Sequence, residues 1–507
     1  MSAIESAFES FQRAYESGRP TVRVATLVAD LETPVSAYLK LAAGRRGNMF
    51  LLESVEGGAQ RGRYSMIGLD PDLVFRSTGA GAEINRVAAT DAEAFQPCPG
   101  KPLDVLRALL KESHIDLPQA MPPMSAGVFG YLGYDMVRQM ERLPAAKPDK
   151  IGVPEALLIR PTVMVVFDAV RDEMSVVTPV RPAAGVAARA AWEAAEARLD
   201  AVVAALEGPL DHAFPAVDPK LMADKAVSNT SDDEFLAMVA KAKEYIAAGD
   251  AFQIVLSQRF TSRFELPAFS LYRALRRVNP SPYLSYLDFG GFQIVVSSPE
   301  ILVKVRDGKV CIRPIAGTRW RGRSPTEDDA LAAELLADPK ERAEHLMLLD
   351  LGRNDVGRVA RIGTVKVTDS FFVERYSHVM HIVSNVEGEL RNDCDVVDAL
   401  SAGFPAGTVS GAPKVRAMEI IDELEKDKRG IYAGCIGYFG AGGEMDTCIV
   451  LRASIVKDGL MHVQAGAGIV YDSDPASEHR ECVNKSQALF RAAEEAVRFA
   501  TSAKRGQ

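Results

Sequence analysis

The chain has 507 residues, enough for two or three domains with sizeable cores, and its 47% hydrophobic and 25% charged residues are typical of globular proteins rather than disordered or fibrous ones. The formal net charge of −9 argues against nucleic acid or an anionic membrane as the main partner. The N-terminus lacks a secretory apolar region, no run approaches the roughly 20 apolar residues of a membrane span, and the six cysteines show no zinc-like spacing. We therefore expect a soluble, cytoplasmic protein with reduced thiols.

The first 180 residues mix short β-like runs with helical stretches and Gly-rich turns. The Ala-rich segment 182–207 carries apolar residues at helical spacing, which predicts a connecting helix whose role the sequence does not reveal. Gly and Pro residues over 208–219 then predict a linker. We expect an α+β protein of two lobes, with an N-terminal lobe at 1–215 and a catalytic lobe at 216–507.

Two helices in the second half have clear start signals. A capping-box pattern begins at Ser231 and predicts a helix to about residue 248. Asp338 followed by Pro339 predicts the start of another helix. These signals place the helices that carry the acidic pairs described next.

Paired carboxylates occur at i, i+3 spacing on two predicted helices. Glu341 and Glu344 share one helical face, and Glu478 and Glu481 share another, with Lys485 one turn further on. Each pair alone is typical of a solvated helix. The two pairs brought together would suit Mg²⁺, which prefers oxygen ligands and keeps several waters.

Gly-rich segments suggest anion contacts without matching a nucleotide-binding fingerprint. The stretch 404–414 leads into a helix with Pro413 at its first position, and its free N–H groups with Thr408 or Ser410 could hold an anion. The stretch 466–468 follows a β-like run and predicts an ordinary turn or a ligand-contacting one. Arg452 lies in the β-like run 447–456, where a cation needs a carboxylate from the protein or from a ligand.

Several motifs together are more specific than any one of them. They occur in the order seen in chorismate-utilising enzymes, and the chain resembles the large, component I subunits of anthranilate synthase. The resemblance implies a fold of antiparallel sheets packed face to face with helices outside. The motifs are Pro314–Thr318, Glu341–Asp355, Gly407–Lys414, Gln464–Ile469 and Asp472–Pro475, followed by Glu478 and Glu481.

The resemblance implies a role for each matching residue. It assigns Mg²⁺ to Glu344 and Glu481, with Glu341 and Glu478 as neighbours. It makes Glu300 the general acid that helps the 4-hydroxyl of chorismate leave, and it ties His381 to the loss of pyruvate and the C2 proton, with His378 as the competing histidine. Substrate contacts are implied for Gly317, Thr318, Tyr432, Arg452, Gly466, Ala467, Gly468 and Lys485, and Thr408 joins the catalytic group.

Two positions separate branches of the family. Isochorismate-forming relatives carry a water-activating lysine where this chain has Gln253, and aminodeoxychorismate synthases carry a lysine nucleophile where it has Ala316. Both substitutions favour direct amination at C2 and hence anthranilate and pyruvate, by way of an aminodeoxyisochorismate intermediate. The alternatives are an aminodeoxychorismate synthase and a non-catalytic paralogue that binds chorismate or tryptophan.

The resemblance also implies partners. This reaction is the first step of tryptophan synthesis, and feedback inhibition by tryptophan is expected. The chain shows no Cys–His arrangement of a glutamine amidotransferase, which implies that a separate subunit supplies ammonia. The alternative is that the segments expected to bind tryptophan are only a polar strand end and a Pro-rich turn. The expected tryptophan-binding residues are Glu53, Ser54, Pro282, Tyr283 and Leu284.

Overall fold

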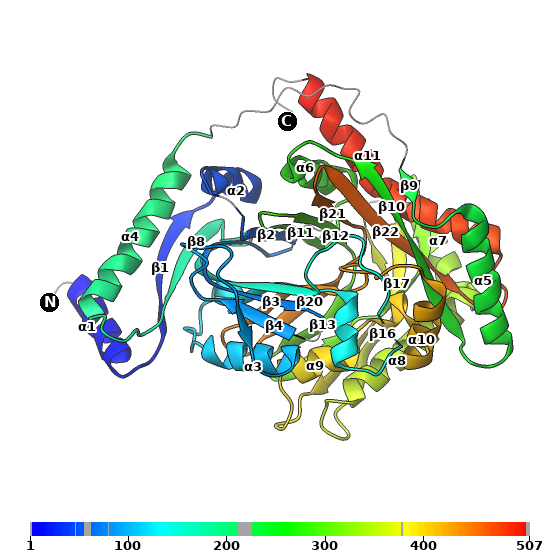
Figure 1. Cartoon of the computed structure of the whole chain (residues 1–507), viewed down its shortest axis with the longest axis horizontal. Coiled ribbons are helices and arrows are strands. Elements are labelled where there is room, and N and C mark those ends of the chain that lie inside the picture. Colours follow the sequence, from blue (N-terminus) through cyan, green and yellow to red (C-terminus); the bar gives the residue numbers. More distant parts are fainter. Residues whose placement is uncertain are drawn as a thin grey trace.

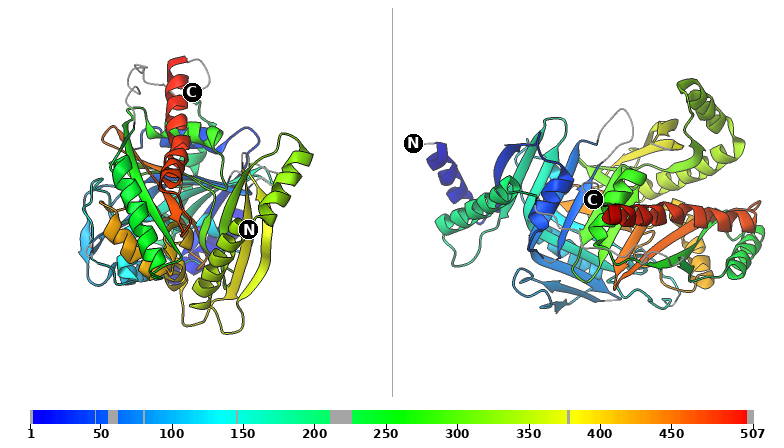
Figure 2. Two further views of the ribbon diagram at one scale, coloured as in Figure 1. Left: turned by 90° about the vertical axis from the view of Figure 1, so that its right-hand side faces the viewer. Right: turned by 90° about the horizontal axis from the view of Figure 1, so that it is seen from above.

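The computed structural model describes residues 3–45, 47–54, 62–79, 81–144, 146–210, 226–376 and 379–502. Its named strands pair antiparallel into two large layers that pack face to face, with most helices on the outer faces (Figures 1 and 2). This is the predicted α+β architecture, and the prediction is confirmed.

The first layer has one end beside the C-terminal helix α11 (Pro475–Ser502), which packs against β22 (Leu460–Ile469). Strand β10 (Gln253–Arg263) ends this layer and pairs on its outer side with two very short strands, β9 (Val227–Ser228) and β18 (Gly411–Ala412). The order in space is β1 (Thr21–Val28), β8 (Glu173–Val180), β7 (Ala156–Asp168), β3 (Tyr64–Thr78), β2 (Met49–Glu53), β11 (Tyr283–Asp288), β12 (Gln293–Ser298), β21 (Ala453–Lys457), β22 (Leu460–Ile469) and β10 (Gln253–Arg263).

The second layer shares β3 and β7 with the first. At its far end, β14 (Lys309–Ile312) and β15 (Ile315–Trp320) pair in succession with one edge of β17 (Val379–Glu389). Strand β16 (Lys366–Arg375) pairs with the other edge of β17. The order in space is β5 (Gln96–Cys98), β4 (Gly81–Asn85), β3, β7, β6 (Gly127–Leu132), β19 (Cys435–Gly440), β20 (Met445–Ile449), β13 (Ile301–Arg306), β14 (Lys309–Ile312), β15 (Ile315–Trp320), β17 (Val379–Glu389) and β16 (Lys366–Arg375).

The long strands β3 and β7 pass from one layer to the other because their pairing is interrupted midway. The register shifts between Pro71 and Leu73, where Pro71 faces Pro161, and Asp70 has a φ of 50°. Proline lacks an N–H and cannot complete a ladder, so the strands bend there. The two halves of each strand can therefore join different sheets.

Helices cover both outer faces, and aromatic and aliphatic side chains fill the space between the sheets. The first layer is covered by α2, α4, α6 and α11, and the second by α3, α8, α9 and part of α10. The helices are α1 (Ala3–Glu16), α2 (Pro34–Ala42), α3 (Pro102–Glu112), α4 (Ala188–Glu207), α5 (Asp232–Ala247), α6 (Ala268–Val278), α7 (Pro325–Ala337), α8 (Pro339–Gly357), α9 (Val396–Gly403), α10 (Lys414–Leu424) and α11 (Pro475–Ser502), with 3-10 turns η1 (Pro123–Ser125), η2 (Tyr134–Gln139) and η4 (Gly407–Val409).

The helix starts predicted from capping signals are confirmed. Ser231 and Glu234 form the capping box of α5, and Asp338 caps α8, which begins at Pro339. The Ala-rich segment forms α4 over Ala188–Glu207, a shorter helix than the predicted 182–207. The start of α10 was predicted wrongly, because Pro413 is the residue before the helix rather than its first residue.

Two predictions about strand boundaries were also wrong. Gly466 and Gly468 lie inside β22 instead of forming a turn, and Arg452 lies between β20 and β21 with a φ of 48° instead of within a strand. A Cβ on Gly466 would lie 2.7 Å from the Leu256 carbonyl oxygen of β10. Close approach of neighbouring strands therefore requires glycine in β22.

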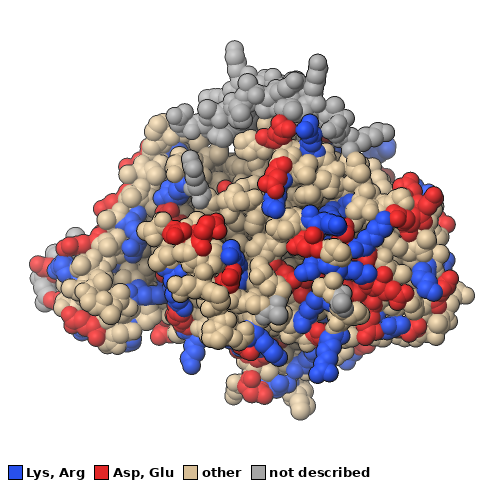
Figure 3. All heavy atoms as spheres, viewed as in Figure 1, with Lys and Arg blue, Asp and Glu red and all other residues tan. Residues whose placement is uncertain are grey.

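Both sheets contain strands from either side of residue 215. In the first layer β2 pairs with β11, and in the second β6 pairs with β19. The division into lobes at 1–215 and 216–507 stays a prediction, and most of its predicted linker, 211–219, lies outside the described residues. Across the described ranges, helices are all too short or too polar to cross a membrane. On the face shown in Figure 3, basic and acidic groups are interspersed.

Candidate functional site

Glu300 lies buried between β12 and β13 and is joined to the loop that contains Thr408. The Thr408 hydroxyl lies 3.2 and 3.3 Å from the two carboxyl oxygens of Glu300. Burial raises the pKa of Glu300 to about 8, against the opposing effect of hydrogen bonds from Thr408 and the Ile315 amide. The two side chains also line a cavity beside α8. Glu300 is therefore a carboxyl group that can carry a proton near neutral pH.

A β-bulge aims the Gly317–Thr318 segment at His381. The pairing of β15 with β17 shifts register between Ala316 and Arg319, so that Gly317 and Thr318 together face one residue, His381. Gly317 has a φ of 68°, the left-handed conformation that a bulge of this type places on glycine. The sequence motif thus encodes a local irregularity that presents two residues to the histidine.

The hydrogen bonds of His381 define which ring nitrogen is free. Its Nδ1 lies 2.7 Å from the Gly317 carbonyl oxygen, which can only accept, so Nδ1 carries the proton. Burial, assisted by the positive charges of Arg452 and Lys485, lowers the pKa of His381 to about 4. The imidazole is neutral at pH 7, with Nε2 able to accept a proton. The competing His378 lies outside the described residues.

The predicted metal residue Glu344 projects from α8 toward β10. The Gln253 side-chain amide donates to its carboxylate at 3.1 Å. Burial raises the pKa of Glu344, and the negative charges of Glu341 and Glu481 raise it further. The carboxylates of α8 and α11 are thus close enough to repel one another, as the sequence-based Mg²⁺ hypothesis requires.

Each of the other carboxylates near Glu344 has its own partner or neighbour. Glu341 accepts from Arg319 at 3.2 Å, and Glu481 pairs with Lys485 at 2.6 Å. Burial and Glu481 raise the pKa of Glu478. Among the described residues, sets of three potential ligands that converge on one point are absent. Mutually repelling carboxylates that do not fill a coordination sphere fit Mg²⁺, which takes one or two of them and completes its shell with water and substrate oxygens.

Lys485 joins α11 to β22 within the same site. Its ammonium group donates to the Gly466 carbonyl oxygen at 3.0 Å while it pairs with Glu481. A Cβ on Gly466 would lie 2.9 Å from the Tyr432 hydroxyl, and one on Gly468 would lie 2.9 Å from the Gln253 side-chain nitrogen. Tyr432 and Gln253 therefore lie against the same face of β22, close enough that a side chain at either glycine would collide with them.

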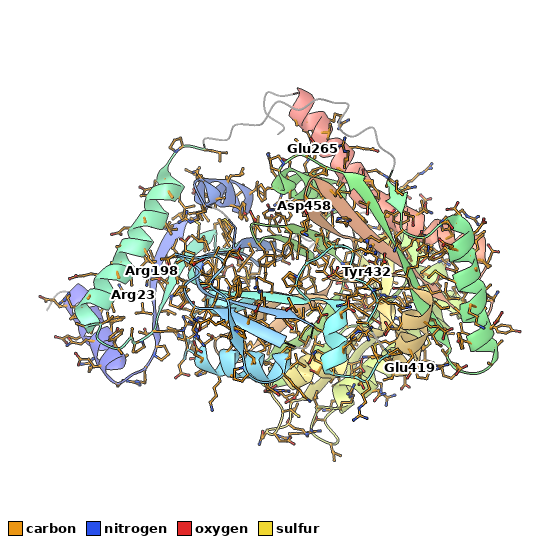
Figure 4. The ribbon with its side chains drawn as sticks, in the orientation of Figure 1. Arg23, Arg198, Glu265, Glu419, Tyr432 and Asp458 are labelled. Carbon is orange, nitrogen blue, oxygen red and sulfur yellow. The ribbon has the colours of Figure 1, made fainter. Side chains whose placement is uncertain are left out.

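Arg452 is a half-buried cation, and Tyr432 is a buried phenol. Burial lowers the pKa of Arg452, and within the part of the chain that the structure describes its guanidinium makes no ion pair. Tyr432, labelled in Figure 4, is buried, and burial raises its pKa well above the ordinary value. The predicted need of Arg452 for a carboxylate partner is therefore not met by the described protein side chains, which leaves it to a ligand.

Tyr376 and Arg319 are site residues that sequence reasoning missed. The Tyr376 ring lies 5.5 Å from the ring of His381, and its hydroxyl donates to Glu374 at 3.0 Å. Burial raises the pKa of Tyr376, and the negative charges of Glu374 and Glu300 raise it further. Arg319 holds Glu341 and the α8 cap Asp338 at once. The position of Arg319 beside the Gly317–Thr318 motif was the one available signal; Tyr376 had none.

The predicted tryptophan segments lie side by side. In the pairing of β2 with β11, Glu53 faces Leu284, and Tyr283 begins the same strand. The Glu53 carboxylate is buried and accepts from the Tyr272 hydroxyl at 2.7 Å and from Arg276 at 3.0 Å. A ligand amino group would join or replace these donors. Ser54 directly follows β2, and Pro282 directly precedes β11.

A family model described as chorismate binding enzyme matches residues 59–491. The chain therefore belongs to the chorismate-binding enzyme family, and the resemblance inferred from its motifs is confirmed. It is 55% identical to anthranilate synthase component 1 of Cereibacter sphaeroides over 505 residues, which is 99% of this chain and 100% of that protein. It is 46% identical to anthranilate synthase component 1 of Pseudomonas putida, covering 94% and 95% of the two chains.

Solved structures agree with this assignment. The crystal structure of anthranilate synthase component I from Streptococcus pneumoniae matches with a TM-score of 0.76 and 37% identity over 92% of this chain and 99% of that one. The menaquinone-specific isochorismate synthase of Escherichia coli matches with a TM-score of 0.70 and 20% identity over 97% and 100% of the two chains. The second likeness shows a shared fold.

Proposed function

We propose that this chain is the chorismate-using subunit of an anthranilate synthase. It converts chorismate and ammonia to anthranilate, pyruvate and water by way of aminodeoxyisochorismate. The proposal is supported by similarity to anthranilate synthase component 1 proteins along the whole chain. The single observation that carries it is the buried carboxyl of Glu300, held by the Thr408 hydroxyl, together with the buried imidazole of His381, whose Nδ1 is held by the Gly317 carbonyl oxygen.

Substrate binding in this proposal begins at Arg452, whose guanidinium has no ion pair among the described residues. Arg452 and Tyr432 hold the enolpyruvyl carboxylate, with help from the backbone of Gly466, Ala467 and Gly468. Thr318 and Lys485 contact the remainder of the substrate. Glu344 and Glu481 would hold Mg²⁺ beside the ring carboxylate, where the ion acts as a Lewis acid and a template.

The first chemical step is amination. The ammonia nitrogen forms a bond to C2, and both ring double bonds shift, from C1=C2 to C1=C6 and from C5=C6 to C4=C5. The C4–O bond breaks as Glu300 gives its proton to the departing hydroxyl, which leaves as water, and the new ammonium group loses one proton to solvent. The Thr408 hydroxyl holds the carboxyl in place for this transfer. Gln253 and Ala316 supply neither a base for water nor an amine nucleophile, so ammonia is the reagent that remains.

The second step is elimination. Nε2 of His381 takes the C2 proton, the bond from C3 to the enolpyruvyl oxygen breaks, and the side chain leaves as pyruvate after its methylene carbon gains a proton. The ring becomes aromatic, which drives the step. We further propose that a separate glutamine amidotransferase subunit supplies the ammonia and that tryptophan inhibits the enzyme at the segment around Glu53, Ser54, Pro282, Tyr283 and Leu284.

The test uses the purified chain alone with chorismate, Mg²⁺ and an ammonium salt. Anthranilate fluorescence together with one equivalent of pyruvate is the expected result, and glutamine in place of ammonium should give no product without the partner subunit. An aminated product that retains its pyruvyl group would assign the chain to the aminodeoxychorismate synthases. Intact chorismate under all conditions would indicate a binding-only paralogue.

A further inference from the structure

A buried ion pair lies directly behind the candidate site. Glu425 and Arg429 are 5% and 2% exposed. Two guanidinium nitrogens of Arg429 donate to the two carboxylate oxygens of Glu425, at 2.9 Å from Nε and 2.6 Å from Nη2. Neither residue belongs to the motifs that carry the family resemblance, and neither is among the residues expected to touch the substrate.

The remaining donors of Arg429 hold two backbone segments of the site. Its Nη1 donates to the Val409 carbonyl oxygen and its Nη2 to the Val255 carbonyl oxygen, each at 2.7 Å. Val409 follows Thr408, and Val255 lies two residues after Gln253 on β10. A single guanidinium thus holds both the segment that carries Thr408 and the strand that carries Gln253.

Aromatic rings from both halves of the chain pack around the same guanidinium. Its central carbon lies 5.7 Å from the ring centroid of Tyr432 and 4.8 Å from that of Tyr134. A cation held near an aromatic face restrains the position of the ring. The hydroxyl of Tyr432 faces Gly466, so the ring position sets the distance between Tyr432 and β22.

Glu425 extends the network to β22. Its Oε1 accepts from the backbone amide and the hydroxyl of Ser257, at 2.8 and 2.9 Å. The Ser257 hydroxyl in turn accepts from the Gln464 side chain at 2.8 Å, and Ser257 faces Gly466 in the pairing of β10 with β22. The side chains of Glu425 and Arg429 therefore bond to each other and to the backbone of β10 and of the segment after Thr408.

A buried ion pair is weak evidence for a stabilising role, because well-packed apolar residues often stabilise a fold equally well. The guanidinium instead supplies geometry, since its planar donors reach a carboxylate and two carbonyls at fixed angles. We propose that Glu425 and Arg429 are positioning residues for chorismate binding. The pair sets the relative places of Thr408, Gln253, Tyr432 and Gly466. The predicted changes in KM and kcat rest on the proposed function, whereas the predicted change in the Kd for chorismate rests only on membership of the chorismate-binding family.

The test compares Arg429→Lys with Arg160→Lys. Lysine preserves the charge opposite Glu425. Its donors all lie on one nitrogen, however, and cannot reach the carboxylate and the carbonyl oxygens of Val409 and Val255 as the separate nitrogens of the planar guanidinium do. Arg160 is a matched control, because it is buried, pairs with Asp72 and Glu112, and bonds to none of the segments that carry site residues. Chorismate Kd is measured by titration calorimetry with Mg²⁺, together with KM, kcat and the melting temperature.

Arg429→Lys should raise both the Kd for chorismate and the KM at least tenfold. Arg160→Lys should change each of these constants less than twofold, although it lowers the melting temperature by a comparable amount. A Kd for Arg429→Lys within twofold of wild type would overturn the proposal, as would equal losses of affinity in the two variants. If Arg429→Lys does not fold, the double variant Glu425→Met, Arg429→Met removes both charges, and near-native affinity in that protein would also overturn it. A wild type that binds chorismate without making anthranilate, with Kd still weakened in Arg429→Lys, would reject the proposed function and support the positioning role.

Discussion

Glu300 shows how the environment of one residue changes its chemistry. Burial favours the neutral form of a carboxyl group, and the raised pKa of about 8 keeps the proton on Glu300 at neutral pH. The Thr408 hydroxyl orients the group without restoring its ordinary pKa. A carboxyl that remains protonated at the operating pH is suited to protonate a leaving hydroxyl.

The first prediction concerns the pH dependence of activity. In the proposed mechanism, kcat should fall as pH rises through about 8, because Glu300 then loses the proton that it must donate. Glu300→Gln should lower kcat by about 10²-fold or more, the usual contribution of a general acid, and should remove this limb of the profile. Initial rates of anthranilate formation across pH measure both effects. An unchanged profile in the variant would assign the acid elsewhere.

The same group makes a stability prediction with a defined sign. Between the ordinary pKa of 4.5 and about 8, the folded state holds the Glu300 proton and the unfolded state releases it. Folding stability from this group is therefore greatest below the ordinary pKa and declines as pH rises toward 8. Urea unfolding of wild type and Glu300→Gln should show the variant gaining stability relative to wild type over that range. A constant difference would contradict the raised pKa.

At the scale of elements, α8 and α11 bring together carboxylates from distant parts of the sequence. Glu344 reaches β10 through Gln253, and Glu481 reaches β22 through Lys485. Each helix also carries a second glutamate three residues earlier. The repulsion among these groups is relieved when a divalent cation lies between them. The two helices therefore form the walls of the proposed Mg²⁺ site.

The prediction at this scale concerns the affinity of the α8 and α11 glutamates for Mg²⁺. Glu344→Gln and Glu481→Gln should each weaken Mg²⁺ binding at least tenfold, because each removes a candidate oxygen ligand and its charge. Mn²⁺ titration followed by electron paramagnetic resonance gives a readout that does not depend on turnover. Glu494→Gln, an exposed position on the same helix α11, is the control. Unaltered binding in both site variants would place the metal elsewhere.

At the scale of the whole molecule, strands from the two halves of the chain pair with each other near the expected tryptophan segments. β2 from the first half pairs with β11 from the second, and β11 continues through β12 to Glu300. A ligand held between Ser54 and Pro282 would therefore bear on strands that lead to the catalytic acid. This continuity would give the proposed feedback inhibition a physical route through the first sheet.

The corresponding prediction concerns tryptophan sensitivity. Ser54→Ala should raise the tryptophan concentration for half-inhibition at least tenfold, because a hydrogen bond to the ligand is lost. Ser17→Ala, at an exposed serine after α1, should leave that concentration within twofold of wild type. Inhibition curves at fixed chorismate measure both. Equal inhibition of Ser54→Ala and wild type would place the regulatory site elsewhere.

Local sequence signals predicted parts of the site well where the relevant physics is local. The caps at Ser231 and Asp338 and the paired glutamates depend on groups three or four residues apart. The positions of Arg452 and Gly466 were predicted wrongly because strand ends depend on pairing with distant strands. Tyr376 carried no signal at all, since its meaning comes from contact with His381.

The sequence by itself determined the family, the residue types at each candidate position and the starts of the main helices. These follow from motif order and from short-range hydrogen bonding, which act along the chain. The tertiary structure alone decided that Glu300 is buried, that His381 is neutral with Nε2 free, and that Glu425 and Arg429 lie behind the site. Desolvation and long-range pairing create these properties, and both depend on residues that are far apart in sequence.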